Sequence, residues 1–122
     1  MEIIARRTLT TSDGRSTCEV VISKPTQQSA DEWRCDFEIR VATATKADYA
    51  CGADSVQALM LSFDGIRREL SALEPALLWE GMPIALAFPR TIPISMGDEF
   101  YREIENHLDA KIESFIDDRS KR

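Results

Sequence analysis

The sequence predicts an α+β fold with an antiparallel sheet of about four strands, followed by a long packing helix and an acidic C-terminal helix. Apolar and polar residues alternate along much of residues 3–51, which is the pattern of half-buried strands. From Asp54 the apolar residues recur every three or four positions, which indicates a helix packed on one side. The 122 residues, of which 43% are hydrophobic and 30% charged, match a single globular domain over 1–122.

Four strands are expected between residues 3 and 51. Residues 3–10 and 17–24 flank the sequence SDGR, whose Asp-Gly pair favours a hairpin turn. Residues 33–41 alternate most clearly, and a short partner strand is expected around residues 46–51. A shift of one residue in the third strand would bury four charges, so its inward face is strongly specified. The residues expected to face inward are Trp33, Cys35, Phe37, Ile39 and Val41.

A helix is expected over about residues 54–73. Asp54 is a good N-cap, Gln57 completes a capping-box pattern, and Gly52 permits a tight turn just before. These roles explain the cluster YACGADSVQ without any reactive site. The apolar stripe expected to pack on the sheet consists of Val56, Leu59, Phe63, Ile66, Leu70 and Leu73.

Small and apolar residues lie on the predicted opposite face of the same helix, where a solvated helix would carry charges. These residues are Ala58, Leu61, Gly65 and Ala72. A glycine in the middle of a helix costs about 1 kcal/mol relative to alanine, so close packing is the natural reason for Gly65. We expect either an intramolecular neighbour over this face or a homodimer formed through Ala58, Leu61 and Gly65.

Residues 74–97 are expected to be irregular, with one short strand at residues 84–88. This segment begins directly after Glu74 with Pro75 and contains three more prolines, Pro83, Pro89 and Pro93. Proline cannot donate to a strand ladder, so a long central strand is excluded here.

The last predicted element is a helix over about residues 98–118, with an apolar stripe and a concentration of acids. Eight acidic residues stand against Arg102 and Lys111 in this range, so it carries a charge of −6, equal to the formal charge of the whole chain. The apolar stripe consists of Tyr101, Ile104, Leu108, Ile112 and Phe115. Four acids recur at intervals of four residues and form what we call the acidic ridge: Glu105, Asp109, Glu113 and Asp117.

Three interpretations of the acidic ridge are open at this point. It can be a solvated outer face, a docking surface for a basic partner, or a source of paired catalytic carboxylates. Catalysis is the weakest of the three, because nothing apolar nearby would separate the pKa values of two carboxylates, as acid–base chemistry requires.

The cysteines and the single histidine give little sign of a metal or catalytic site. Cys18, Cys35 and Cys51 have no zinc-ligand spacing, and buried reduced thiols explain them. A thiol-dependent enzyme would need Cys51 as nucleophile and His107, the only histidine, as base. No phosphate-binding glycine-rich loop, GxSxG elbow or HExxH motif is present. No cofactor and no metal site are therefore predicted.

The overall charge makes some partners more natural than others. Lysine and arginine supply most non-specific affinity for nucleic acids, so an acidic chain with a pI near 4.8 argues against DNA or RNA. The N-terminal sequence MEIIARR lacks the apolar core of a signal peptide, and no apolar run has the length of a membrane span. A cytoplasmic protein with a basic protein partner is the expectation.

Several short motifs, taken together, resemble a family of small bacterial proteins of unknown function. They are IIARR at the start, EWRCDFEI from Glu32, YACGADSVQAL from Tyr49, then LWEG and AFP. The WRC and GxDSxQAL pieces carry most of the resemblance, which spans residues 3–89. It implies a bacterial source and an α+β domain of strands followed by a helix. The family has no known site residues to transfer, and its usual pattern ends before the acidic helix.

The function that these observations favour is a non-enzymatic, cytoplasmic protein-binding domain that uses the acidic ridge. One form is an immunity or antitoxin-like protein that neutralises a basic nuclease toxin, because charge complementarity gives fast association. A secretion-chaperone-like binder is a second form. The alternative from a different class is the thiol-dependent enzyme with Cys51 and His107.

Overall fold

The computed structural model describes residues 1–121, which divide into two compact units. Unit 1 comprises residues 1–91, and unit 2 begins at Ile92. Unit 1 contains the sheet, two helices and the hydrophobic core, and unit 2 contains a short 3-10 turn and one long helix.

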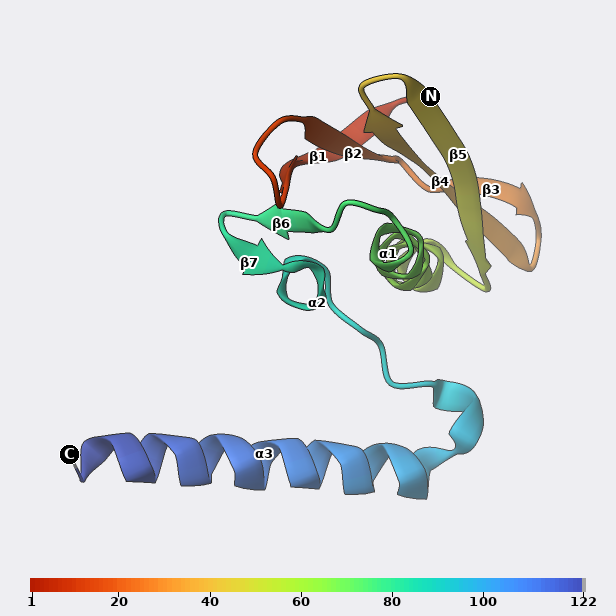
Figure 1. Cartoon of the computed structure of the whole chain (residues 1–122). Helices are drawn as coiled ribbons and strands as arrows, with labels where there is room; N and C mark the ends of the chain where they lie inside the picture. The colour runs from red at the N-terminus through yellow and green to blue at the C-terminus, as the bar shows by residue number, and fades with distance from the viewer. Residues whose placement is uncertain (122) are drawn as a thin grey trace. The chain divides into compact units, whose positions relative to one another are not determined.

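Unit 1 is built on an antiparallel sheet with one long helix against it (Figure 1). The sheet order is β3-β4-β2-β1-β6-β7, and β5 pairs with β4. The α+β class and the antiparallel pairing are confirmed, but the sheet has seven strands where about four were predicted. The strands are β1 (Ile3–Thr11), β2 (Thr17–Ser23), β3 (Thr26–Ser29), β4 (Glu32–Val41), β5 (Ala44–Gly52), β6 (Leu77–Trp79) and β7 (Met82–Pro83).

Strand β4 has partners along both of its sides, which explains part of the difference in strand number. Phe37 pairs with Ile22 of β2 and with Asp48 of β5, so these two strands flank β4. Arg34 pairs with Thr26 of β3 and with Cys51 of β5, so β3 lies on the same side as β2. Strands β2 and β3 thus follow one another along β4 and are separated at Pro25, which has no N–H to donate.

The segment 74–97 is more regular than predicted. It contributes β6, which pairs with β1, and β7, which pairs with β6. The predicted short strand at residues 84–88 is wrong, because Ile84–Ala87 form a short helix, α2. Pro83 precedes this helix in an extended conformation, and its missing N–H costs nothing at a helix start. Short strands of two and three residues are too brief to give a periodic signal in the sequence.

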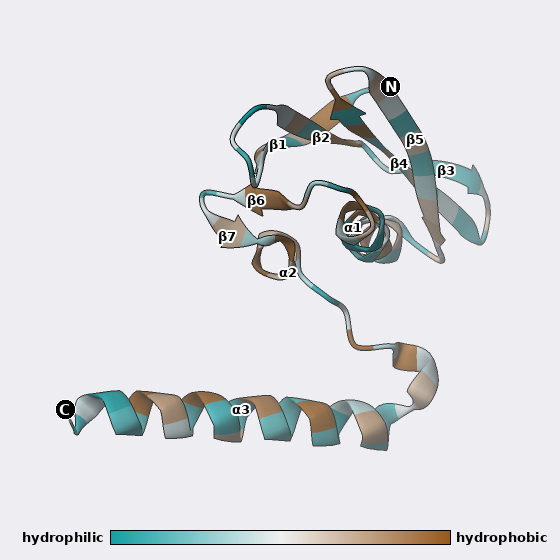
Figure 2. Ribbon diagram, viewed as in Figure 1, coloured by the Kyte–Doolittle hydropathy of each residue, from teal (hydrophilic) through white to brown (hydrophobic). Residues whose placement is uncertain are grey.

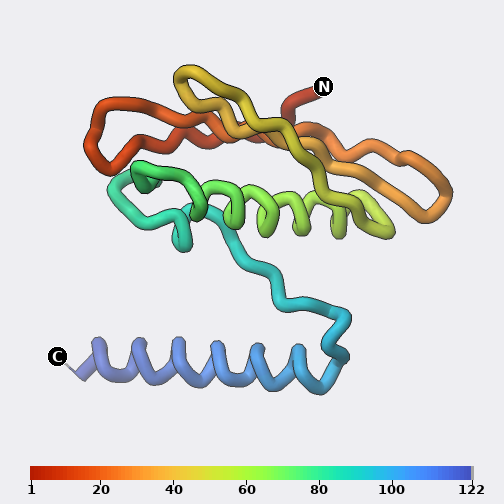
Figure 3. Tube along the Cα trace, turned by 45° about the vertical axis from the view of Figure 1, so that its right-hand side comes forward, coloured from red at the N-terminus to blue at the C-terminus, as the bar shows by residue number. Residues whose placement is uncertain are grey.

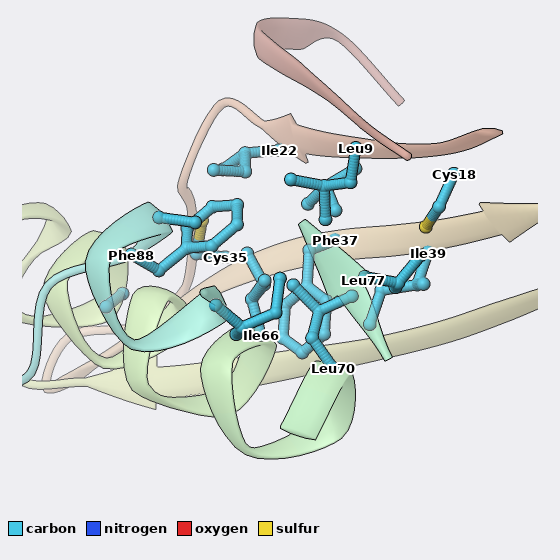
Figure 4. Packing of buried hydrophobic residues seen from close by; sticks show 14 residues of the cluster. Leu9, Cys18, Ile22, Cys35, Phe37, Ile39, Ile66, Leu70, Leu77 and Phe88 are labelled. Carbon is cyan, nitrogen blue, oxygen red and sulfur yellow. The ribbon is translucent and has the colours of Figure 1, made fainter. Parts of the chain in front are cut away.

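Helix α1 (Ser55–Ser71) covers one face of the sheet, and α2 packs beside it and against β6 (Figure 3). The core fills the space between these layers. Phe37 and Ile39 of β4 meet Ile66 and Leu70 of α1, and Leu77 of β6 joins them (Figure 4). The predicted facing of β4 is confirmed, since Cys35, Phe37 and Ile39 are at most 2% exposed.

The face of α1 that meets the sheet was assigned partly wrongly from the sequence. Ala58 and Gly65, predicted on the opposite face, are buried in the structure, whereas Val56 is 62% exposed. A Cβ atom built on Gly65 would lie 3.3 Å from the Phe37 ring, so the small residues allow the helix to approach the sheet closely. The intramolecular neighbour expected at these residues is therefore the sheet itself. Since only Leu61 of the three proposed dimer residues is exposed, Ala58, Leu61 and Gly65 do not form one accessible face.

Unit 2 contains the 3-10 helix η1 (Ile94–Met96) and the helix α3 (Asp98–Ser120). The predicted C-terminal helix is confirmed with nearly the predicted bounds. Gly97 stands at the N-cap position without a side-chain cap, and Asp98 and Glu99 in the first turn complement the helix dipole.

Candidate functional site

The acidic ridge lies on α3, and all four of its residues are exposed. The structure thus brings Glu105, Asp109, Glu113 and Asp117 onto one helix as predicted, one turn apart from each other. Within residues 92–121 of unit 2, none of these four carboxylates lies within 4 Å of a lysine, arginine or histidine nitrogen. The ion pair found on α3 joins Arg102 to Asp98 at 3.1 Å, in the first turn. In this part of the chain, the negative charge of the ridge is therefore not neutralised by ion pairs.

No other part of unit 2, as far as the structure describes it, covers the apolar stripe of α3, which the sequence did not predict. No residue of this helix is buried, although the helix is 23 residues long. Leu108 is 49% exposed, Ile112 54% and Phe115 61%. Apolar and polar residues alternate in bands along the helix (Figure 2). The sequence showed the stripe, but a stripe alone gives no information about what covers it.

With about 100° of rotation per residue, the apolar stripe of α3 lies beside the first residues of the acidic ridge. Glu105 follows Ile104 directly, and Asp109 follows Leu108, so the first half of the ridge borders the apolar side chains. Further along, the ridge turns away from the stripe, because a four-residue step overshoots a full turn by about 40°. The result is an amphipathic helix with an exposed apolar surface and carboxylates along one border of it. Such a surface can contact an apolar segment that carries basic side chains at its margin.

The cluster that precedes α1 is structural. The Asp54 carboxylate accepts a hydrogen bond from the Gln57 backbone N–H at 2.8 Å, and the Gln57 side-chain oxygen accepts one from the Ala53 N–H at 2.6 Å. Asp54 is therefore the N-cap, as predicted. The reciprocal bond of Gln57 goes to Ala53, one residue earlier than in an ordinary capping box.

Cys51 and His107, the residues of the alternative enzyme hypothesis, lie in different units of the chain. Cys51 lies in β5 rather than in the first turn of α1, and a hydrogen bond with Glu32 together with partial desolvation raises its pKa. A catalytic thiol needs a lowered pKa, so this environment works against nucleophilic chemistry. His107 is an exposed residue of α3, in unit 2. Burial raises the pKa of Cys18 and of Cys35, and both are fully buried.

Metal-ligand clusters and membrane-spanning helices are absent from residues 1–121. No three side chains of His, Cys, Asp or Glu in this range are grouped so that they could hold a metal ion. None of the helices in this range has the length and apolar character that crossing a membrane requires.

A match to a known protein family lies within unit 1. Residues 5–90 match the family model described as a domain of unknown function, DUF6968. No curated protein and no solved structure matches the chain. The matched range ends one residue before unit 1 does, and helix α3 lies outside it. With most of its length within that match, the chain belongs to the DUF6968 family, whose function is unknown.

Proposed function

We propose that this protein is a non-enzymatic protein-binding domain and that α3 is its binding element. The observation that carries the proposal is the exposure of the stripe on α3: Leu108, Ile112 and Phe115 are about half exposed or more on a helix without one buried residue. Isolated helices are marginally stable in water, and large apolar side chains are normally covered, so a partner would stabilise α3 as it binds.

The acidic ridge supplies the chemistry of the proposed partner. Carboxylates without ion-pair partners at the margin of the stripe favour lysine and arginine on the other side of the interface, and they disfavour acidic segments. The partner segment is therefore an amphipathic basic helix or strand. An immunity-like protein against a basic toxin, and a secretion-chaperone-like binder of a basic export substrate, are the two forms of this proposal.

The experiment is a binding titration with a defined peptide. The probe is an amphipathic helical peptide with leucines along one face and lysines beside them, and the control peptide has the same composition in scrambled order. We expect the full chain to bind the first peptide, with a dissociation constant that rises steeply with salt because exposed charges are screened beyond about 10 Å at 0.1 M. Equal binding of both peptides would overturn the proposal.

Variants separate the ridge from general acidity. In the ridge variant, Glu105, Asp109, Glu113 and Asp117 are changed to glutamine. A matched control changes exposed acids of unit 1 instead: Glu2, Asp31, Asp48 and Glu74. We expect the first variant to lose the salt-dependent part of binding and the second to bind as the native chain does. If both variants lose binding equally, only net charge matters and the ridge has no specific role.

A further inference from the structure

Unit 1 has a pocket at one end of the interface between its sheet and its helices. The pocket has a volume of about 240 Å³, and its walls include Val20 and Ile22 of β2, Phe63 of α1, and Phe88 just after α2. The Phe63 and Phe88 rings lie 6.5 Å apart between centroids. An apolar cavity of about 150 Å³ is enough for benzene in another protein, so this pocket has room for a small organic ligand.

Two cations, Arg6 and Arg7, line this pocket, and they differ in their surroundings. Side chains alternate along β1, so Arg7 shares the face of Leu9, which is fully buried in the core. The Arg7 guanidinium lies 4.0 Å from the centre of the Trp79 ring and 5.4 Å from that of Phe88. Its Nη1 group donates a hydrogen bond to the carbonyl oxygen of Ala87. The aromatic rings and this bond hold the guanidinium in place at the pocket.

The charge of Arg7 has no carboxylate partner among residues 1–121. The neighbouring Arg6 is different, because it is paired with Glu19 at 2.7 Å. A guanidinium has five N–H donors, and the bond to Ala87 uses one of them. A half-buried guanidinium with unused donors is well suited to bind a carboxylate through two parallel hydrogen bonds.

We infer that this pocket binds a small organic carboxylate with an apolar tail. The carboxylate pairs with Arg7, and the tail occupies the space between Ile22, Phe63 and Phe88. The site lies wholly in unit 1 and is independent of the protein binding proposed for α3. All the residues that line it lie within the family match, and they bring an apolar wall and a guanidinium without a carboxylate partner together.

The test is a titration of the full chain, observed by NMR of backbone amides. Hexanoate represents a free aliphatic acid, and N-acetyl-leucine represents the carboxyl terminus of a peptide. Two compounds serve as controls: hexan-1-ol, which has the apolar tail without the charge, and acetate, which has the carboxylate without the tail. We expect saturable shifts around Arg7, Ile22 and Phe88 with one or both carboxylates, and about tenfold weaker binding of hexanol and acetate. The tighter of the two carboxylates identifies the source of the ligand.

Variants distinguish binding from a structural role of Arg7. Arg7→Gln is expected to weaken binding of the carboxylate at least about tenfold. Arg15→Gln, which removes an exposed arginine of unit 1 outside the pocket, is the matched control that should leave binding unchanged. Ala5→Leu places a larger side chain at the exposed rim of the pocket and should block the tail while Arg7 stays intact. Absence of saturable shifts, hexanol binding as tightly as hexanoate, or unchanged affinity in folded Arg7→Gln or Ala5→Leu would each overturn the inference.

Discussion

A Cβ atom built on Gly52 would lie 2.5 Å from the backbone nitrogen of Ala58 and 2.9 Å from the carbonyl carbon of Gln57. Both neighbours are backbone atoms of the first turn of α1, so they cannot move aside as a flexible side chain would. The glycine is thus needed for the close approach of β5 to the helix that follows it.

We predict that Gly52→Ala destabilises the protein by about 1–3 kcal/mol, the usual range for overpacking. Denaturant unfolding followed by circular dichroism measures the change. Gly65→Ala is the comparison, because its added Cβ meets only the Phe37 ring, at 3.3 Å, and alanine gains about 1 kcal/mol in helix propensity. If Gly65→Ala lowers the free energy of unfolding more than Gly52→Ala does, the junction between β5 and α1 is not the tighter contact.

The cap of α1 gives a second prediction at the same scale. Asp54→Ala removes the acceptor of the Gln57 N–H and should lower the free energy of unfolding by about 1 kcal/mol. Asp54→Asn keeps an acceptor and should retain most of the stability. An unchanged unfolding midpoint in Asp54→Ala would mean that water replaces the cap without loss.

The thiol of Cys51 should react slowly at neutral pH. The hydrogen bond with Glu32 favours the protonated thiol and raises the pKa of Cys51, so the thiolate fraction at pH 7–8 is below that of a free cysteine. We expect the alkylation rate, measured against pH, to rise only above the ordinary thiol range. Glu32→Gln should shift this profile to lower pH. A fast reaction at neutral pH in the native chain would contradict this prediction and support the enzyme hypothesis.

At the scale of the elements, the periodicity of apolar residues predicted the features that depend on local spacing alone. The facing of β4 and the extent of α1 follow from apolar spacing, and both are confirmed. The side of α1 that meets the sheet was harder to predict from the sequence. Ala58, Ser62 and Gly65 are not recognisable as core residues by their hydrophobicity. Gly65, for example, lies against the ring of Phe37, which comes from another part of the chain.

The candidate sites likewise have some features that the sequence predicts and others that depend on tertiary packing. The spacing of the acidic ridge is visible in the sequence, but the exposure of the apolar stripe on α3 is not, since exposure depends on what packs against it. Arg7 could have been noticed from its position in phase with Leu9 on β1. Its aromatic neighbours Trp79 and Phe88 could not have been predicted from the sequence. They come from far along the chain, where the pairing of β6 with β1 brings this segment close to Arg7.

Charge reversal on α3 should leave the fold intact. In the double variant Asp109→Lys with Glu113→Lys, two exposed carboxylates are replaced. The pairs with Glu105 and Asp117 change from repulsive to attractive, by about 0.2–0.5 kcal/mol each, whereas the pair 109–113 stays like-charged. We expect an unchanged unfolding midpoint and an equal or larger helical signal at 222 nm. Loss of the helical signal would mean that the ridge is paired internally, and the docking proposal would fail.

At the scale of the whole molecule, the hydrophobic core is formed by residues of unit 1. All residues of the hydrophobic cluster lie between Leu9 and Phe88, within the range that matches the family. The chain of unit 1 ends at Thr91, whose N–H donates to the Asp64 carboxylate of α1 at 3.0 Å.

We therefore predict that a chain ending at Thr91 folds and has nearly the unfolding midpoint of the full chain. Removal of residues 92–122 deletes no member of the cluster and no strand of the sheet. Calorimetry of both chains measures the difference. A drop of several degrees in the shorter chain would show that unit 2 contributes to the stability of unit 1.

The free edges of the sheet have a consequence for how copies of this protein behave when crowded. Strand β5 lies on the outer side of β4 and carries Lys46 and Asp48, and β7, at one end of the sheet order, is two residues long and contains Pro83. Charges, short length and proline keep edge strands from pairing with other chains, so pairing between copies is discouraged along β5 and β7. By contrast, β3 pairs with β4 alone and β1 pairs with β6 only at Thr10 and Thr11, so these two strands keep backbone groups open to a strand from another chain.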